Sequence, residues 1–256
     1  MCSVFLRSPR AVAKPALRVI GGIVGLMVLG LGAMPVLAIP EAEAIKKLEA
    51  VVVYVVVSAE GQPAFVVDQE SPDQLVLPMF MKAERAQQAQ ETLEADPNTE
   101  GSRVVPLSLN IAFERNEKLI QEIRAQDENA SLVTPLVPAR EDWQKAEEIL
   151  LAQGIAQDEI ARNLTVPVFF SDPPISITPP GTDEAKIALF FNYSQLQQAK
   201  QAVPDFDGED KVVDWRQAIN IVIQDEEDRY FFFPTEDAIR IIQAQQEEAQ
   251  KKEVQE

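Results

Sequence analysis

The sequence predicts an α+β fold of two pseudo-symmetric lobes from an internal duplication, each lobe a mixed β-sheet flanked by helices. Three observations lead to this prediction. The composition is globular, because 46% of the 256 residues are hydrophobic and 25% are charged. Short β-branched and aromatic runs alternate with polar stretches rich in Gln, Ala and Glu, a pattern that favours strands alternating with helices. The order of these runs is also repeated along the chain.

The repeat is clearest where a strand passes into a helix. "PMFMKAERAQQAQETL" begins at Pro78, and "ALFFNYSQLQQAKQAV" begins at Ala188, so that Phe80 corresponds to Phe190. The segments that match around these helices lie at 51–67, 102–110 and 132–154 in the first copy and at 164–180, 210–218 and 230–248 in the second. Each copy therefore reads β-β-α-β-(x)-β-α, which is longer than the units of solenoid repeats. Ser194 and Thr235 are the expected N-caps of two helices in the second copy.

The first residues have the pattern of an export signal. A basic region with four Arg and Lys residues precedes the apolar run 19–38, and Val36 and Ala38 have the spacing that a signal peptidase reads. An uncleaved membrane anchor is the alternative, since the apolar run approaches the ~20 residues that a spanning helix needs. The predicted organisation is an export signal at 1–38, a first lobe at 39–155, a second lobe at 156–248 and a disordered tail at 249–256.

The residue inventory excludes several classes of function. The chain has no His and one Cys, Cys2, which rules out His-based acid–base catalysis and His-containing zinc sites. The formal net charge is -18, so a phosphate backbone would repel the chain and we expect no nucleic acid partner. No glycine-rich phosphate loop or nucleophile elbow is present. We expect no cofactor, no metal and no enzymatic activity.

Two acidic runs are the remaining candidates for site chemistry. "DFDGED" at 205–210 suggests calcium, but the sixth and twelfth positions of an EF-hand loop would fall on Asp210 and Arg216 instead of Gly and Glu. "QDEEDR" at 224–229 clusters four carboxylates between two apolar runs. A solvated acidic turn explains the first run, and a hairpin turn explains the second.

Strands that are apolar on both faces are typical of buried strands, and this is one explanation of several runs here. The other is that helices cover one face while the opposite face lines an open groove for apolar segments of unfolded client proteins. Methionine suits such a groove because its side chain adapts to varied shapes. The predicted client-binding residues are Met79, Met81, Phe190, Phe191, Phe231 and Phe233.

Several of these motifs together are similar to one known family. "LPMFMKAERAQQAQETL", "VVPLSLNIAF", "VPVFFSD" and "FFFPTEDA" follow one another in an acidic, exported chain. This order resembles the family of the twenty-two-kilodalton subunit of the chloroplast inner-envelope protein translocon (Tic) and its cyanobacterial periplasmic relatives. The resemblance covers roughly Ala44 to Glu247.

The resemblance implies a non-enzymatic protein with two related lobes and apolar grooves that acts between two membranes. Its role would be protein transport and, in the bacterial relatives, outer-membrane biogenesis as a holdase. Because the leader is a bacterial-type signal, we expect the periplasm, which corresponds to the intermembrane space of the envelope in plastid relatives, with a thylakoid-lumen pool as a further location. The expected partners are unfolded preproteins or outer-membrane proteins, and a component of a membrane translocon or of outer-membrane assembly. A structural adaptor for a translocon component and a carboxylate-based hydrolase are the alternatives.

Overall fold

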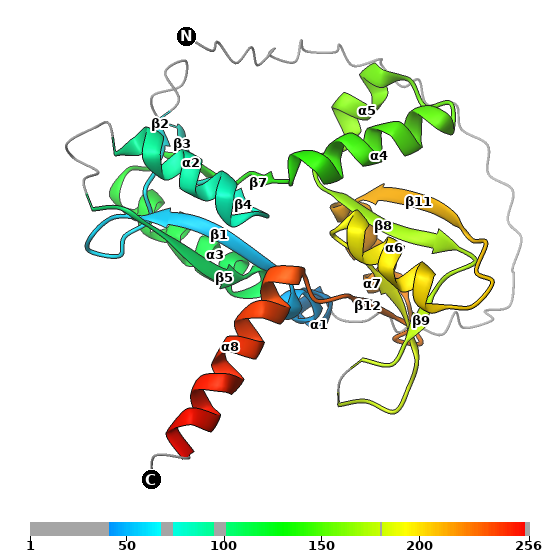
Figure 1. Cartoon of the computed structure of the whole chain (residues 1–256). Helices are drawn as coiled ribbons and strands as arrows, with labels where there is room; N and C mark the ends of the chain where they lie inside the picture. Colours follow the sequence, from blue (N-terminus) through cyan, green and yellow to red (C-terminus); the bar gives the residue numbers. More distant parts are fainter. Residues whose placement is uncertain (1–40, 68–73, 95–100, 180, 254–256) are drawn as a thin grey trace, which may run out of the picture. The chain divides into compact units, whose positions relative to one another are not determined.

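The computed structural model describes residues 41–67, 74–94, 101–179 and 181–253 (Figure 1). Contacts divide the chain into residues 1–35 and residues 36–256, and every element described below belongs to the second unit. The predicted export signal at 1–38 and Cys2 lie outside the described residues. Over the ranges that the structure describes, no helix combines the length and the apolar character needed to cross a membrane.

The first half of the described chain builds a four-stranded sheet in the order β5-β1-β4-β7. All residues of its strand β1 (Val52–Val57) are buried, as expected for a Val-rich strand that is covered on both faces. Strand β1 pairs antiparallel with β5 (Arg103–Ser108) and with β4 (Met79–Phe80), and β4 pairs parallel with β7 (Leu136–Val137). A smaller sheet has the order β2-β3-β6, formed by Val66–Val67, Gln74–Val76 and Ser131–Val133.

The second half pairs its strands in the corresponding order. Strand β8 (Pro167–Asp172) runs antiparallel to β11 (Glu209–Asp214). An antiparallel bridge from Phe169 to Phe190 connects β8 with the end of β10 (Lys186–Leu189), and β10 pairs parallel with β12 (Tyr230–Phe232). A short strand β9 (Ser176–Ile177) pairs with the start of β10.

The strand register is also the same in both halves. Tyr54 lies opposite Phe80 in the first half, and Phe169 lies opposite Phe190 in the second. The strand pairing therefore agrees with the sequence alignment that matches Phe80 with Phe190.

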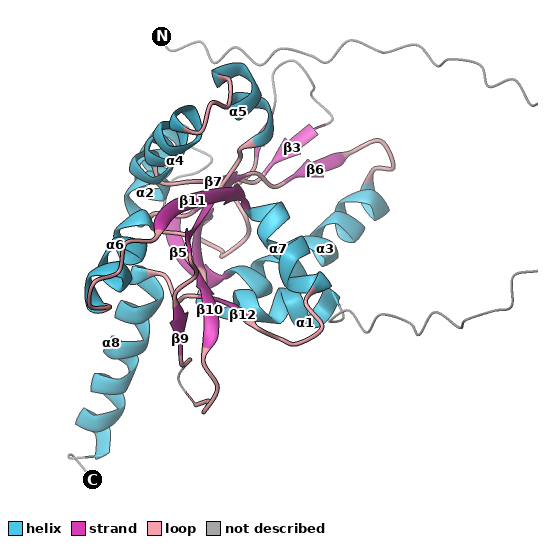
Figure 2. Cartoon of the chain, turned by 90° about the vertical axis from the view of Figure 1, so that its right-hand side faces the viewer, coloured by secondary structure: helices cyan, strands magenta, loops and turns pink. Residues whose placement is uncertain are grey.

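Each strand-to-helix junction recurs as well. Helices α2 and α6 follow β4 and β10, α3 and α7 follow β5 and β11 without a break, and α4 and α8 follow β7 and β12. The bounds are Glu41–Lys46 for α1, Ala83–Leu93 for α2, Leu109–Gln126 for α3, Arg140–Ala152 for α4, Gln157–Asn163 for α5, Tyr193–Ala202 for α6, Trp215–Gln224 for α7 and Glu236–Glu253 for α8, with a 3-10 helix at Lys47–Ala50. Figure 2 shows the strands between α2, α4, α6 and α8 on one side and α1, α3 and α7 on the other.

The closing helix of each half covers the sheet of the other half. Ala146 of α4 is buried in a cluster with Phe169 and other residues of the second half. Ala238 of α8 is buried with Tyr54 and Phe80 of the first half. The two halves therefore complete each other, and neither sheet is covered by its own helices alone.

The largest core cluster takes buried residues from both halves. It includes Val53 and Met79 of the first half together with Val168 and Phe191 of the second. Burial of this shared apolar surface stabilises the arrangement of the two halves, because each buried Å² of apolar area contributes ~25 cal/mol. The predicted boundary between lobes at residues 155 and 156 falls in the connection between α4 and α5.

Local predictions at helix ends were partly right. The Thr235 hydroxyl accepts a hydrogen bond from the backbone N–H of Ala238 at 3.3 Å, as expected of the N-cap of α8. The prediction for Ser194 was wrong, because α6 already begins at Tyr193 and its N-cap is Asn192. The Ser194 hydroxyl instead donates to Glu236 at 2.8 Å.

Two further expectations need correction. The acidic run 224–229 does not join two strands, since it connects helix α7 to β12. Trp215, Ile219 and Ile223 have helical spacing, and Asp214 caps this helix. Helix α8 continues to Glu253, into the range 249–256 that was expected to be a disordered tail, because its Ala, Gln, Glu and Lys residues are strong helix formers.

Candidate client-binding sites

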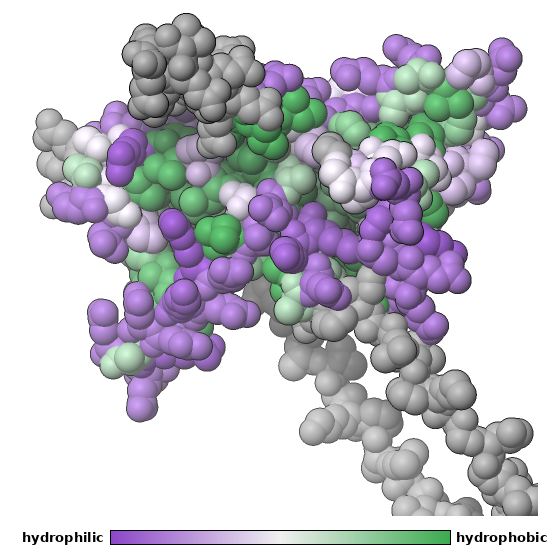
Figure 3. All heavy atoms as spheres, turned by 90° about the horizontal axis from the view of Figure 1, so that it is seen from below, coloured by the Kyte–Doolittle hydropathy of each residue, from purple (hydrophilic) through white to green (hydrophobic). Residues whose placement is uncertain are grey.

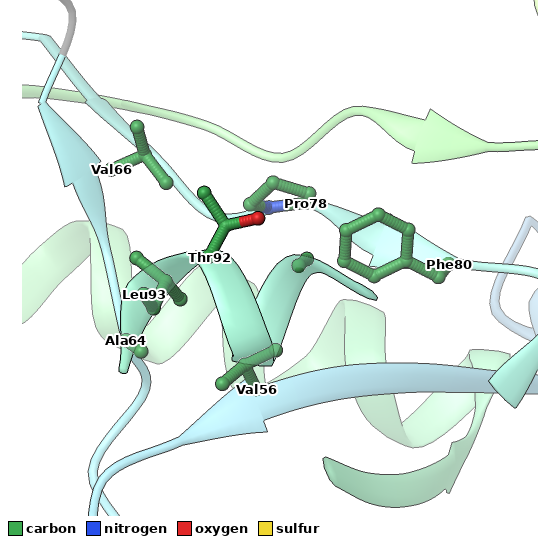
Figure 4. Close-up of a pocket in the computed structure, with 8 residues that line it drawn as sticks. Val56, Ala64, Val66, Pro78, Phe80, Thr92 and Leu93 are labelled. Atoms are coloured by element: carbon green, nitrogen blue, oxygen red, sulfur yellow. The ribbon is translucent and has the colours of Figure 1, made fainter. Parts of the chain in front are cut away.

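An apolar pocket lies beneath the C-terminal part of α2, and we call it the α2 pocket (Figure 4). It has a volume of about 250 Å³. Strand, turn and helix all contribute to it, so its lining is not continuous in sequence. The lining residues are Val56, Ala64, Val66, Pro78, Phe80, Ala89, Thr92 and Leu93.

The chemistry of the α2 pocket is apolar. Thr92 carries the one side-chain polar group of the lining, and its hydroxyl already donates a hydrogen bond to the backbone oxygen of Gln88 at 2.9 Å. Val66 at the rim is 43% exposed, which is high for a large aliphatic side chain. Such a pocket favours an apolar group and offers nothing to orient a polar substrate.

The structure places four of the six predicted client-binding residues in the core. Met79, Met81 and Phe191 are buried in the cluster that both halves share, and Phe190 is fully buried in the second-half cluster. The reason is that helices cover both faces of these strands. Successive side chains of a strand point to opposite faces, so each of these side chains is buried in one core cluster or another. In this conformation these four side chains do not reach a client, and their predicted role is untested.

The other two predicted residues are only half-buried. The Phe233 ring packs against Phe190 with centroids 5.1 Å apart and against Phe231 at 6.3 Å. Phe231 also lines a groove of about 850 Å³ between α1, the end of β12 and α8. Figure 3, which views the molecule from below, shows apolar surface bordered by hydrophilic residues on this side.

Charged residues border the groove near Phe231. Lys47 and Lys186 both form ion pairs with Asp228. Burial alone would raise the pKa of the Asp228 carboxyl, but the hydrogen bonds from Lys186 and Lys47 outweigh it and hold that pKa below its usual value. Two ammonium groups thus share one carboxylate at this rim, and over the whole lining three lysines are balanced by three carboxylates, those of Glu43, Glu49 and Asp228.

A polar junction forms where the N-terminal ends of α2, α4, α6 and α8 approach one another. Asp142 accepts hydrogen bonds from the backbone N–H of Tyr193 at 2.9 Å and from the Asn192 amide at 3.1 Å. On the other side of this junction Lys82 forms an ion pair with Glu236 at 3.8 Å. Carboxylates at helix N-termini are electrostatically favourable. This junction therefore stabilises the positions of α4 and α8, the two helices that each cover the sheet of the other half. Burial nevertheless raises the pKa of Asp142.

In the described residues, carboxylates of both acidic runs accept hydrogen bonds from neighbouring side chains and so stabilise the fold. Asp210 accepts from Tyr193, Gln197 and Lys200. The Asp225 carboxylate accepts from the Arg229 side chain at 2.8 Å. No group of three or more His, Cys, Asp and Glu side chains that could hold a metal occurs in the part of the chain that the structure describes.

Sequence reasoning did not find the α2 pocket. It identified Phe80 only as the counterpart of Phe190, and nothing in the pattern marked Ala64, Ala89 or Thr92 as pocket residues. The only signal in the sequence was the presence of small residues next to large ones. Small residues indicate a pocket only where they face the same space, and the sequence does not show which residues do so.

Comparison by sequence finds no matching family model and no matching curated protein. Comparison of structures finds Anabaena Tic22, described as a protein of protein transport, with a TM-score of 0.65 and 15% identity over 80% of this chain and 97% of that one. Tic22 from Plasmodium falciparum is similar as well, with a TM-score of 0.60 and 17% identity over 77% of this chain and 94% of its own. Both likenesses cover nearly the whole of the known structures. The chain therefore has the Tic22 fold, which confirms the resemblance indicated by its sequence motifs.

Proposed function

We propose that this chain acts in protein transport as a non-enzymatic, chaperone-like protein of the Tic22 type that holds unfolded polypeptides. The observation that carries this proposal is the fold shared over 97% of Anabaena Tic22, whose description is protein transport. Fold alone does not specify function, so the proposal also needs a site that suits the activity.

The α2 pocket supplies such a site. It is apolar and has an exposed aliphatic residue, Val66, at its rim. Apolar contact is weakly selective, so a protein that holds many clients benefits from it. The sequence has no His, and the described residues show no metal-binding cluster, so the site has no evident chemistry beyond binding.

The remaining parts of the proposal concern location and origin. We propose that the chain works in the periplasm in outer-membrane biogenesis, in contact with an outer-membrane assembly or translocon component. Support comes from the export-signal pattern at 1–38 and from the net charge of -18, which keeps the protein away from anionic membrane surfaces. We further propose that the two halves derive from an internal duplication, because strand order, register and helix junctions recur together.

Light scattering tests the proposed activity. A urea-denatured outer-membrane β-barrel protein is diluted into buffer with the purified chain, and its aggregation is followed over time. Serum albumin at the same mass concentration controls for non-specific protection. We expect stoichiometric suppression that persists at high salt, because apolar binding is not screened. Aggregation equal to that in albumin would reject the proposal.

A further inference from the structure

We propose that the α2 pocket accepts an aromatic side chain from the client, in the place that the chain's own Phe206 takes in the second half. The inference rests on the proposed function and gives the chemical class of the group that is held. The argument compares corresponding positions of the two halves.

The alignment that pairs Phe80 with Phe190 gives five lining residues of the α2 pocket a counterpart in the second half, since it also pairs Pro78 with Ala188, Ala89 with Ala199, Thr92 with Ala202 and Leu93 with Val203. Of these counterparts, Ala188, Phe190 and Ala199 belong to or pack against one core cluster of the second half, whereas Ala202 and Val203 are exposed. The same cluster contains Ile175 and packs against Phe206. In the second half, therefore, three of these five positions lie in or against a cluster that large side chains of the chain itself complete.

Phe206 comes from the connection between α6 and β11. Its ring lies so close to Gly208 that a Cβ atom at that glycine would be 2.5 Å from the ring. The Lys200 ammonium lies over this ring, 5.9 Å from its centroid. The connection thus places the Phe206 ring against the second-half cluster, which includes Phe169 of β8 and Leu196 of α6.

The first half has no such residue at the corresponding place in its sequence. The connection between α2 and β5 includes 95–100, which reads "ADPNTE" and contains no aromatic and no large aliphatic residue. These residues lie outside the described ranges, but their composition alone means that they cannot supply a counterpart of Phe206. This connection therefore has no ring to place in the α2 pocket, which is open in the described part of the chain, and in our proposal a client polypeptide supplies the ring.

The size and chemistry of the pocket agree with a single side chain. Its volume of about 250 Å³ is below the ~300–1,000 Å³ of pockets that hold small-molecule ligands. The only hydroxyl of the lining is already hydrogen-bonded. An aromatic ring offers the largest apolar contact per side chain with few rotatable bonds, so it binds with a small loss of conformational entropy.

Fluorine NMR on a short, soluble peptide tests this inference. The peptide is rich in Gly and Ser and carries one 4-fluorophenylalanine, whose resonance reports its environment directly. We expect the resonance to shift and broaden when the intact chain is added. Unlabelled peptides with Phe, Leu or Ser at that position serve as competitors, and the expected order of competition is Phe, then Leu, with no effect of Ser.

Variants that fill the pocket from inside identify the site. Ala89→Phe and Ala64→Phe each place a ring in the lining, and both should weaken peptide binding about tenfold, as expected when an anchoring side chain loses its pocket. Ala152→Phe adds the same ring at an exposed position of α4 and should leave binding unchanged. Thermal unfolding of each variant verifies that it is folded. Two filling variants are used so that the conclusion about the site does not depend on a single variant that misfolds.

The outcomes separate this inference from the proposed function. Peptide binding that survives both filling variants, or that follows Leu as well as Phe, overturns the aromatic assignment even if aggregation of the β-barrel client is still suppressed. Peptide binding that is lost in the filling variants supports the assignment even if no aggregation is suppressed, and in that case only the holding function fails.

Discussion

The two halves of the molecule have the same strand order and register, yet they differ in what lies under the first helix of each. Under α6 the second half packs Ile175 and Phe206 against its core cluster. Under α2 the first half leaves an apolar pocket of about 250 Å³. The difference shows that two halves with the same strand order can differ in packing, since side chains of the chain fill the second half and leave a pocket in the first. The predictions below change one half and use the other as the control.

Truncation of the matched phenylalanines should give the largest effect. Phe190→Ala should lower the free energy of unfolding by about 3–5 kcal/mol, since Phe190 is fully buried in a filled cluster. Phe80→Ala should cost less, nearer 3 kcal/mol, because Phe80 borders an existing pocket and has fewer packing partners to lose. Urea unfolding at fixed pH measures both values. Equal losses would mean that the two sites are packed alike.

The N-caps of α3 and α7 offer a second comparison. Asp214 accepts hydrogen bonds from Thr165 N–H at 2.7 Å, from the Thr165 hydroxyl at 2.6 Å and from Arg216 N–H at 3.1 Å. Ser108 stands at the corresponding place, as the last residue of β5, and makes no side-chain capping bond. The sequence alignment of 102–110 with 210–218 was wrong by two residues here, because it paired Asp214 with Pro106. Asp214→Ala should therefore destabilise the protein by about 2 kcal/mol, and Ser108→Ala by less than about 0.5 kcal/mol.

This comparison also depends on pH. Burial would raise the pKa of the Asp214 carboxyl, but hydrogen bonds from Arg216 and Thr165 outweigh it and hold that pKa below its usual value. A carboxyl with a lowered pKa in the folded state stabilises the fold above its unfolded pKa of ~3.9, and this stabilisation is lost as the pH falls through the folded value. The difference between wild type and Asp214→Ala should thus be full at pH 7 and shrink below pH ~4. A difference that grows on acidification would contradict the assigned interactions.

Placing a new ring under each helix should give a smaller effect that differs between the halves. Ala199→Phe should lower stability by about 1–3 kcal/mol, because the surrounding cluster is already filled. Ala89→Phe should change it by less than about 0.5 kcal/mol, since the α2 pocket has room for the ring. Thermal melting of the two variants side by side gives the answer. A greater loss for Ala89→Phe than for Ala199→Phe would show that the α2 pocket is not the looser site.

Much of the framework was predictable because it rests on local patterns. The β-branched run of β1 and the polar helices after β4 and β10 follow from residue periodicity and propensity. The equivalence of Phe80 and Phe190 came from aligned sequence, and the strand pairing agrees with it.

The candidate site was not predictable in the same way. The burial of Met79 and Phe191 depends on helices that cover both faces of the sheets, including two exchanged between the halves. A sequence that is apolar on both faces does not say whether such cover exists. The α2 pocket depends on Ala64, Ala89 and Thr92, which come from separate elements and have no shared periodicity. Ser194 was misassigned because two polar residues near a helix start compete for the cap and only geometry decides between them.

Site-specific photocrosslinking most directly tests the claim that the first half receives clients and the second does not. A diazirine-bearing residue replaces Val66 at the rim of the α2 pocket or Val203 at the end of α6, two positions with similar exposure of 43% and 40%. Each protein is irradiated with the denatured outer-membrane β-barrel protein, and the yield of crosslinked client is measured. We predict a high yield from position 66 and a yield near background from position 203. Equal yields, or a higher yield from position 203, would contradict the account.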